Sequence, residues 1–415
     1  DRFGASKMMT EPRVDRSTTE DSNLLGRSED PIFFPFDRIA CPGLVLPKNR
    51  HGQSVRVWAR SLVGMQKEAL VASTQSGVGW RLASDEGPYL DGYDAAPCPL
   101  AFMTVGMVSC YMNELLAVAR QRGVDLGDFM LVQDSRYTME GSALQGTMTG
   151  GALPVELEVC VGGRIDDAAV QEVVAAAVAS APVAGLLRAP HTSLFSLTVD
   201  GAAVDVDRVS GIGGVAEPDP GFVFSSLRPA SGYTGGLVDR LEAVESLRGV
   251  AGGAGTSLQA DQRRQLHLRA RCRRRSDGVK EIDQYLYRPL GSTFRFFSDE
   301  AVDGGGTGRA PDAASYMAAG IAFCFMTQQG RYASIMKKDL SAYRVVQDLH
   351  VSSGVSGGDV GVGVADAVET HVYVETVEGE AFARQSIDMA EQTCFLHALC
   401  RTPLEPTVSI TRLSP

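Results

Sequence analysis

Trp80-Arg81-Leu82-Ala83-Ser84-Asp85-Glu86 and Phe294-Arg295-Phe296-Phe297-Ser298-Asp299-Glu300 are two versions of one stretch of sequence, separated by 214 residues (298 − 84 = 214). The same offset relates a later group of residues: Met103, Gly106 and Cys110 match Met317, Gly320 and Cys324. After a deletion of one residue the offset becomes 213 (401 − 188 = 213). A repeat of this length predicts two homologous halves fused head to tail.

The repeat divides the chain into four predicted parts. Residues 1–50 form an N-terminal extension, and the aromatic stretch Pro31-Ile32-Phe33-Phe34-Pro35-Phe36 is expected to fasten it to the body. Residues 51–203 form the first repeat domain, and residues 263–415 form the second. A Gly-rich connector, residues 204–262, lies between them. Within the connector a short amphipathic helix is predicted from the spacing of Leu237, Leu241, Val244 and Leu247.

Each half has the same predicted order of elements: strands, a long apolar helix, more strands, a second helix and a final strand. The stretch Leu100–Arg120 is apolar nearly all round, so this helix is expected to be buried on every side. Its duplicate runs from Asp312 to Met336. The last helices are predicted near residues 166–188 and 380–401, with Pro182 interrupting only the first. The fold class is α+β, with sheets packed on central helices.

Composition excludes several classes of protein. The chain has 415 residues, 44% of them hydrophobic and 21% charged, as in an ordinary globular protein. A formal charge of −11 argues against bulk nucleic-acid binding. The arginines of residues 263–275 alternate with apolar residues, which favours a solvated strand face over an anion-binding patch. No apolar stretch is long enough to span a membrane and no secretory signal is visible, so we expect a cytoplasmic protein without membrane contact.

Eight cysteines are too few for a disulfide framework and include no CxxC pair. The histidines are scattered without metal-ligand spacing, so neither a metal nor a cofactor is expected. The glycine run 304–306 lacks the Gly-Lys-Ser/Thr of a phosphate loop and is interpreted as a flexible turn. Individually placed, reduced thiols are therefore the feature to explain.

The thiol most suited to chemistry is Cys394. His397 is three residues later and Arg401 is four residues after that, so all three are expected on one side of a helix. A thiol within reach of an imidazole and a guanidinium ionises readily, and the thiolate is the reactive form. The matching residues of the first half are Ala181, Ala184 and Arg188. The alternative is that Cys394 and Cys324 are small core residues, as many buried cysteines are.

The sequence resembles the OsmC/Ohr family, named for osmotically inducible protein C and organic hydroperoxide resistance. The resemblance lies in Ser84-Asp85-Glu86-Gly87, in Pro99 through Cys110, and in Ala390-Glu391-Gln392-Thr393-Cys394. It implies long buried central helices wrapped by two antiparallel sheets, in which the two OsmC-like repeats form an intrachain pseudo-dimer. It also implies a thiol site at the junction, with Cys324 attacking a hydroperoxide and Cys394 resolving the sulfenic acid as a disulfide.

The family also uses an arginine before the Ser-Asp strand and a glutamate after the proline of the central helix. The corresponding loops of this chain, residues 74–78 and 290–293, contain no arginine. Asp312 follows Pro311 and could replace the glutamate, while Arg331 or Arg295 could supply the cation from elsewhere. Whether Cys98, Cys110 or Cys400 lines the site is left open by the sequence.

Three functions remain. The first is reduction of an organic hydroperoxide by Cys324 and Cys394, with a small hydrophobic substrate and a dithiol reductant. The second is a cysteine hydrolase acting on a thioester, ester or diketone, with His397 as acid/base and Asp312 or Arg401 orienting charge. The third is a scaffold that binds a hydrophobic small molecule without catalysis. The assembly is expected to be a monomeric pseudo-dimer or a homodimer.

Overall fold

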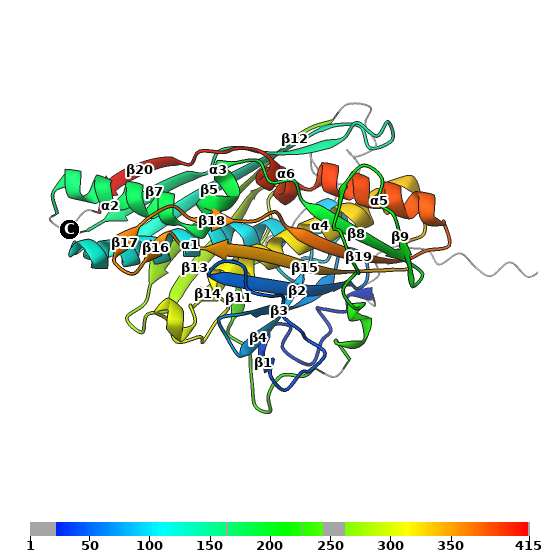
Figure 1. The fold of residues 1–415 in the computed structure, drawn as a ribbon, viewed down its shortest axis with the longest axis horizontal. Coiled ribbons are helices and arrows are strands. Elements are labelled where there is room, and N and C mark those ends of the chain that lie inside the picture. The colour runs from blue at the N-terminus through cyan, green and yellow to red at the C-terminus, as the bar shows by residue number, and fades with distance from the viewer. Residues whose placement is uncertain (1–21, 163–164, 226, 244–261, 414–415) are drawn as a thin grey trace, which may run out of the picture.

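The computed structural model describes residues 22–162, 165–225, 227–243 and 262–413. Two long helices lie at its centre, α1 (Pro99–Arg122) and α4 (Ala313–Met336), as the sequence predicts. Figure 1 shows them between the two large sheets. Helix α1 begins at Pro99 and ends at Gly123, whose left-handed backbone (φ 66°) closes the last turn. Helix α4 begins at Asp312, whose side chain accepts a hydrogen bond from the Ser315 amide at 2.7 Å.

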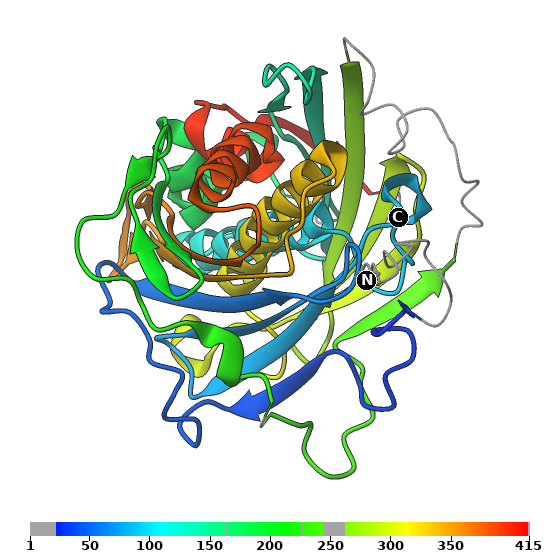
Figure 2. The same cartoon turned by 90° about the vertical axis from the view of Figure 1, so that its right-hand side faces the viewer.

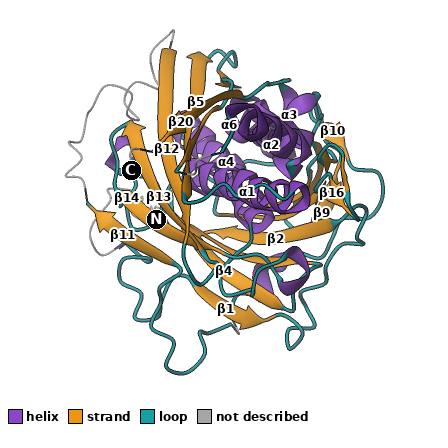
Figure 3. Cartoon of the chain, turned by 90° about the vertical axis from the view of Figure 1, so that its left-hand side faces the viewer, coloured by secondary structure: helices purple, strands orange, loops and turns teal. Residues whose placement is uncertain are grey.

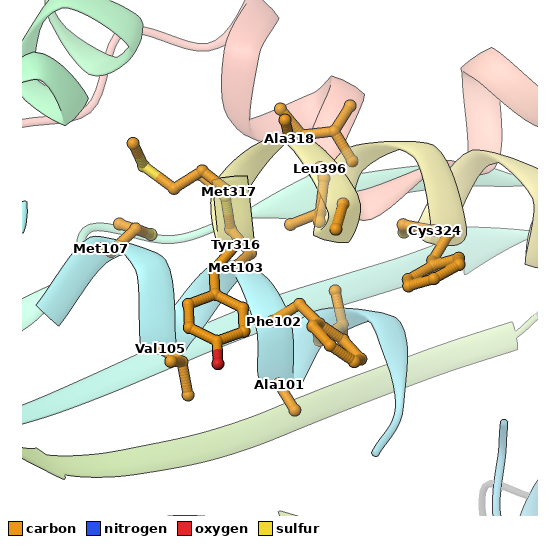
Figure 4. Close-up of a cluster of buried hydrophobic side chains, with 14 of the residues drawn as sticks. Ala101, Phe102, Met103, Val105, Met107, Tyr316, Met317, Ala318, Cys324 and Leu396 are labelled. Carbon is orange, nitrogen blue, oxygen red and sulfur yellow. The ribbon is translucent and has the colours of Figure 1, made fainter. Parts of the chain in front are cut away.

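The two central helices touch through glycines. A Cβ atom placed on Gly106 would lie 2.7 Å from the Met317 amide nitrogen, and one on Gly320 would lie 2.8 Å from the Met103 amide nitrogen. Large side chains fill the space beside this contact, among them Phe102 and Tyr316, whose ring centroids are 6.2 Å apart (Figure 4). By composition α1 is long and apolar enough to cross a membrane, yet 83% of that window is buried inside the protein, as in a core helix.

The first large sheet packs on α4 and contains strands from both halves. Its main path is β1 (Phe34–Asp37), β4 (Val78–Ser84), β3 (Lys67–Ser73), β2 (Gln53–Ser61), β15 (Ala342–Ser352), β19 (Glu369–Glu375), β8 (Leu194–Val199) and β10 (Ser210–Gly211). Two short strands lie off this path, β9 (Ala202–Val204) beside β8 and β18 (Val364–Ala365) beside β15. The halves meet where β2 pairs antiparallel with β15.

The second large sheet packs on α1. Its main path is β11 (Val238–Glu242), β14 (Thr293–Ser298), β13 (Lys280–Arg288), β12 (Gln262–Arg274), β5 (Phe129–Gly141), β7 (Glu156–Val161) and β20 (Thr407–Arg412). Strand β6 (Thr149–Ala152) pairs with β5, and β16 (Val355–Ser356) and β17 (Asp359–Val360) form a separate hairpin. Figure 3 shows both sheets curving around the central helices.

The order of strands corresponds in the two sheets. In the first, β4, β3 and β2 come from the first half, β15 and β19 from the second, and β8 from the first again. In the second, β14, β13, β12, β5, β7 and β20 follow the same order with the halves exchanged. The sheets are mixed rather than antiparallel throughout, because the final strand of each half runs parallel to its neighbour, β8 to β19 and β20 to β7, and β10 also runs parallel to β8. The expectation of purely antiparallel sheets is therefore wrong at these three pairings.

Both late helices are broken, although the sequence predicted a break only at Pro182. Helices α2 (Asp167–Ser180) and α3 (Pro182–Arg188) meet at Ala181, and α5 (Glu380–Thr393) and α6 (Phe395–Arg401) meet at Cys394. Cys394 has extended backbone (φ −70°, ψ 120°), so it ends one helix and begins the next. The free carbonyl groups of Glu391 and Gln392 accept hydrogen bonds from Arg401 at 3.1 and 3.0 Å, so a side chain stabilises the break without proline.

The N-terminal segment and part of the connector cover the outer face of the first sheet. Strand β1 pairs with β4, which confirms that the aromatic stretch fastens the extension to the body (Figure 2). Phe36 and Leu44 from the extension, with Phe224 from the connector, pack on Trp58 and Val346 of the sheet. The described loops include short 3₁₀ turns at Pro88–Leu90, Pro220–Phe222 and Val302–Gly304.

The prediction of a helix at residues 237–247 is wrong for those of these residues that the structure describes. Residues Val238–Glu242 form β11, which pairs antiparallel with β14, while Val244 and Leu247 lie outside the described residues. Pairing with β14 satisfies backbone groups that would otherwise be exposed along a sheet edge, and this outweighs a helical pattern of only a few residues.

Candidate active site

The structure brings together the two thiols and the imidazole that the sequence singled out. Cys324 lies in the middle of α4, and its thiol interacts electrostatically with that of Cys394. His397 Nδ1 lies 3.2 Å from Cys394 Sγ. All eight cysteines are free, so the pair is in the dithiol state. Cys324 is 2% exposed, Cys394 0% and His397 1%, which places the group in the protein interior.

The break between α5 and α6 sets the position of this group. Cys394 is the first residue before α6, and its carbonyl accepts the hydrogen bond from the Ala398 amide at 2.9 Å, so His397 follows within the same first turn. The imidazole packs against two neighbouring rings, with centroids 5.5 Å from Phe195 of β8 and 5.6 Å from Phe325 of α4, which are 5.4 Å from each other. Because β8 belongs to the first half, both halves hold the histidine in place.

The two thiols have opposite electrostatic environments. Burial raises the pKa of Cys324 well above its usual range, and the hydrogen bond to Cys394 raises it further. Burial also acts to raise the pKa of Cys394, but the hydrogen bond from Cys324 and the attraction of His397 outweigh it and hold this pKa well below its usual range. When the pair loses one proton, the thiolate is therefore on Cys394 and the remaining proton on Cys324.

Cys324 also faces a cavity of about 30 Å³, large enough for one or two water-sized groups. Cys394 is not among the residues that line it. The lining combines polar side chains with an apolar rim: Glu86, Tyr89, Leu90, Cys98, Pro99, Leu100, Arg264, Leu266, Leu286, Pro289, Cys324, Thr327, Gln328, Arg331 and Phe395. The sequence did not show whether Cys98, Cys110 or Cys400 lines the site. Cys98 lines this cavity, and Cys110 and Cys400 do not.

The cavity contains the cations that the loop sequences lacked. Arg331 is on the same helix as Cys324, seven residues later, and therefore on the same face. Burial, together with the charge of Arg264, lowers the pKa of Arg331 to about 9. Arg295, the other candidate, is instead on the sheet surface, where Nε donates to Asp283 at 2.7 Å.

Glu86 is the acidic member of this cavity. Burial raises its pKa, and Tyr89 donates its hydroxyl to Oε2 at 2.7 Å. The fully buried Lys67 opposes the rise in the pKa of Glu86, and its electrostatic partners also include Cys324. Sequence reasoning noted Glu86 only as part of the duplicated stretch, because nothing in a linear pattern places a first-half carboxylate beside a second-half helix.

Asp312 is not brought to the thiols. It begins α4, twelve residues before Cys324, which is about 18 Å along a helix. Its Oδ2 accepts from Gln53 Nε2 at 3.1 Å, and Glu300 and Lys280 are its charged neighbours. Burial, and then the charge of Glu300, raise the pKa of Asp312 to about 7. Asp312 therefore belongs to a second polar cluster, with Glu300 and Lys280, at the other end of the helix.

Replacing Asp312 with asparagine should change how stability depends on pH. Between the unfolded-state pKa of about 4 and the folded-state value of about 7, folded Asp312 retains a proton that the unfolded chain has lost, so the free energy of unfolding falls as pH rises through this window. Asparagine also caps helices well and cannot ionise. We expect Asp312→Asn to gain about 2 to 4 kcal/mol relative to the parent protein between pH 5 and pH 8. Urea unfolding of both proteins at pH 5, 6.5 and 8 measures this; a difference that is constant with pH would contradict it.

Arg401 is also placed away from the sulfur atoms. Its guanidinium donates to the carboxylate of Glu391 at 2.8 Å, to the Gly150 carbonyl at 3.1 Å and to the carbonyl groups freed by the helix break. It therefore positions Cys394 indirectly, by stabilising the α5–α6 junction and attaching it to β6.

The corresponding place in the first half lacks these groups. Cys110 is buried in α1, and burial, with the charge of Glu114, raises its pKa strongly. Ala181 and Ala184, which match Cys394 and His397, provide neither a thiol nor an imidazole. Nearby, Lys280 and Asn113 both bind the carboxylate of Glu300, at 3.1 and 2.7 Å. The first-half position thus has a buried polar network but a single thiol.

The arginines of β12 form a solvated face, as the alternation favoured. Arg269 pairs with Asp134 at 2.8 Å, and Arg273 pairs with Glu281. Arg271 lies over the Tyr285 ring at 5.5 Å. Two of these arginines are therefore paired with carboxylates within the sheet, and a third lies over an aromatic ring.

A cleft of about 790 Å³ is separate from the thiol pair. It lies between α2, α3 and β20 and is mainly apolar; Val174, Leu187, Leu404 and Ile410 are among its walls. None of the predicted site residues lines it.

Comparison with known proteins gives a partial family assignment. A family model described as "OsmC-like protein" matches residues 92–194, which is 103 of the 415 residues (194 − 92 + 1 = 103). The chain therefore contains an OsmC-like domain in its first half, from the loop before α1 to the start of β8. The matched range does not include Cys324 or Cys394.

One solved structure with detectable similarity is the crystal structure of an OsmC-like hydroperoxide resistance protein from Jannaschia sp. CCS1. It is 22% identical, over 29% of this chain and 75% of that chain, with a TM-score of 0.20. At this TM-score the likeness informs neither the fold nor the function. No curated protein matches the chain.

Proposed function

We propose that this protein is a thiol peroxidase that reduces organic hydroperoxides at one site, formed by Cys324 and Cys394. The proposal is supported by the electrostatic coupling of these two thiols, by His397 Nδ1 at 3.2 Å from Cys394 Sγ, and by a cavity that Cys324 lines and Cys394 does not. The OsmC-like domain at residues 92–194 supports the same chemistry.

The first step uses Cys324 as the nucleophile and Cys394 as the base. As Cys324 sulfur attacks the terminal oxygen of the hydroperoxide, its proton passes to the Cys394 thiolate, an S–O bond forms and the O–O bond breaks. The products are Cys324 sulfenic acid and an alkoxide, which takes a proton to become the alcohol. Cys324 lines the cavity, whereas Cys394 has the lowered pKa. Transfer of the Cys324 proton to Cys394 allows the accessible thiol to react.

The second step forms a disulfide. Cys394 attacks the sulfenic sulfur of Cys324, the S–S bond forms, and hydroxide leaves and is protonated to water. The sum is a hydroperoxide and two thiols giving an alcohol, water and a disulfide. An external dithiol reductant then returns the pair to the dithiol state.

The cavity, about 30 Å³, has room for the reacting peroxide group but not for a bulky substituent, so we propose that the alkyl group of the substrate lies outside it. Arg331 and Arg264 offer positive charge for the developing alkoxide, and Glu86 can accept a hydrogen bond from the peroxide O–H. Leu90, Leu100 and other apolar side chains at the rim favour a hydrophobic substituent on the substrate.

We further propose that the two halves form an intrachain pseudo-dimer of OsmC-like repeats. The support is the offset of 213 to 214 residues in sequence together with the corresponding order of strands in the two sheets. The lysines Lys67 and Lys280 illustrate the correspondence, because they pair with the matched residues Ser84 and Ser298.

The hydrolase alternative is not proposed, because its features are divided between two sulfurs. The histidine contact belongs to Cys394, which is fully buried and does not line the cavity. A carbonyl substrate would have to reach a thiol that Cys324 separates from the cavity.

One experiment tests the proposed peroxidase directly. The full-length reduced protein, given one equivalent of cumene hydroperoxide, should lose two titratable thiols and yield a Cys324–Cys394 disulfide in peptide mass spectrometry. With dithiothreitol present it should consume the hydroperoxide through many turnovers. Unchanged thiols, or a disulfide between other cysteines, would contradict the assignment.

A further inference from the structure

A second cluster of ionisable side chains lies on the outer face of the first sheet, away from the thiols. Side chains along a strand point alternately to its two faces. Gln347 of β15 points inward, where its Nε2 donates to the Ala318 carbonyl of α4 at 2.9 Å, so Asp348 and His350 point outward. Glu369 of β19 is directly opposite Asp348 in the strand register. One ligand atom from each of Asp348, His350 and Glu369 lies within 4.8 Å of the other two.

His350 has an unused ring nitrogen in a fully buried position. Its Nδ1 is 2.6 Å from Ser54 Oγ, and the Ser54 hydroxyl donates in turn to Asn49 Oδ1 at 3.4 Å. In the tautomer in which the Ser54 hydrogen is directed to Asn49, Nδ1 carries the hydrogen of this pair and Nε2 keeps its lone pair. Among the described residues none hydrogen-bonds to Nε2, and the side chain is 0% exposed. A buried nitrogen with a free lone pair, whose other ring N–H is fixed by a hydrogen bond, has the arrangement of a metal-ligating histidine.

The charges around the cluster leave a negative excess. Four carboxylates gather here, from Asp348, Glu369, Asp366 and Glu217, against the two arginines Arg50 and Arg56, which gives a formal charge of −2 (2 − 4 = −2). Arg56 binds both oxygens of Asp348 at 2.7 Å, and Arg50 binds Glu369 Oε1 at 2.6 Å. Each carboxylate oxygen has two lone pairs, so both groups retain capacity for a further partner.

The second sheet lacks this arrangement at the same register. Asp134 is opposite Glu156 there, and Arg136 takes the place of His350 and pairs with Glu156 at 2.5 Å. Where one sheet has a permanently charged guanidinium, which cannot bind a metal ion, the other has an imidazole, which can.

We propose that Asp348, His350 and Glu369 bind a divalent first-row metal ion, with zinc as the reference. Nitrogen and carboxylate ligands suit zinc, whereas magnesium prefers oxygen ligands alone. The ion would connect β15 to β19, two neighbouring strands of the second half, close to the pairing of β15 with β2. This site does not depend on the proposed thiol chemistry.

The experiment uses zinc ions and the full-length protein with the competing thiols removed. In a Cys324→Ser/Cys394→Ser background we expect one equivalent of zinc to bind, measured by competition with a chromophoric chelator, and zinc to raise the melting temperature. Adding Glu369→Gln or His350→Asn should weaken zinc binding at least tenfold, as expected for loss of a ligand. Glu156→Gln, at the matched register of the other sheet, should leave it unchanged.

Two results would overturn the proposal: no zinc equivalent in the Cys324→Ser/Cys394→Ser background, or equal affinity before and after both ligand substitutions. His350→Asn alters a fully buried residue and its variant could fail to fold. In that case the zinc affinity of the Glu369→Gln variant decides the question. Crystals soaked in zinc give an independent answer through the position of the anomalous peak, which should lie between the three ligands. A peak only elsewhere would also refute the site.

Discussion

Cys324→Ser should abolish hydroperoxide consumption, reducing turnover with cumene hydroperoxide and dithiothreitol to that of a protein-free control. The physical reason is that a serine hydroxyl at this position cannot be oxidised to a sulfenic acid, and no other thiol both lines the cavity and contacts Cys394. The rate of hydroperoxide loss, measured by a ferrous xylenol orange assay, gives the answer.

Cys110→Ser is the matched control for this substitution. Cys110 occupies the same place in α1 that Cys324 occupies in α4, and it is equally buried at 2% exposure. The control should retain full turnover and should unfold at the temperature of the parent protein to within a few degrees. Equal losses in both variants would mean that the effect is one of packing, and full activity in Cys324→Ser would remove Cys324 from the reaction.

Cys394→Ser separates the two chemical steps. The variant should react with one equivalent of hydroperoxide and then stop, since the sulfenic acid on Cys324 has no partner thiol. Dimedone, which labels sulfenic acids, should then label Cys324. It should also react more slowly than the parent protein in that single event, because the base that receives the Cys324 proton is lost.

Gly320→Val should have the largest effect on stability, about 4 kcal/mol or more, sufficient to prevent folding in a marginally stable domain. A Cβ atom at this position would lie 2.8 Å from the Met103 amide nitrogen and 3.2 Å from Met103 Cα. Those atoms belong to the backbone of α1, so a rotamer change cannot relieve the overlap and the central helices must separate.

The control for Gly320→Val is Gly213→Val, because a Cβ atom on Gly213 would meet no atom within 4 Å. Its free energy of unfolding should change by less than about 1 kcal/mol. Urea unfolding followed by circular dichroism compares the two variants. A stable Gly320→Val protein with an unchanged midpoint would show that the close helix contact is not required.

The central elements were predictable because each has a local physical cause. The helix of residues 100–120 is apolar all round and has proline before it and glycine after it, signals that do not depend on the rest of the fold. The strand of residues 263–275 alternates over its whole length. The contact of Cys394 with His397 follows from a spacing of three residues, although Cys394 proves to be the residue before the helix rather than within it.

The errors arose where tertiary contacts decide the outcome. Residues 238–242 are a strand because the exposed edge of β14 accepts them, and no local pattern reports an edge. The break at Cys394 is stabilised by Arg401 from seven residues later, with no proline to signal it. Glu86, Arg264 and Cys98 reach the cavity across the junction of the halves, so only the strand order could have placed them beside Cys324.

The crossing of strands and side chains between the halves has an evolutionary consequence. The first half has Ala181 where the second has Cys394, yet it supplies Glu86 and Cys98 to the cavity beside Cys324, and Phe195 to the imidazole. In a dimer of identical subunits every mutation would change two equivalent sites. If the proposed fusion of two copies holds, one site can diverge in a single polypeptide while those of its residues that reach the other site remain under purifying selection, so the two halves would be constrained at different positions.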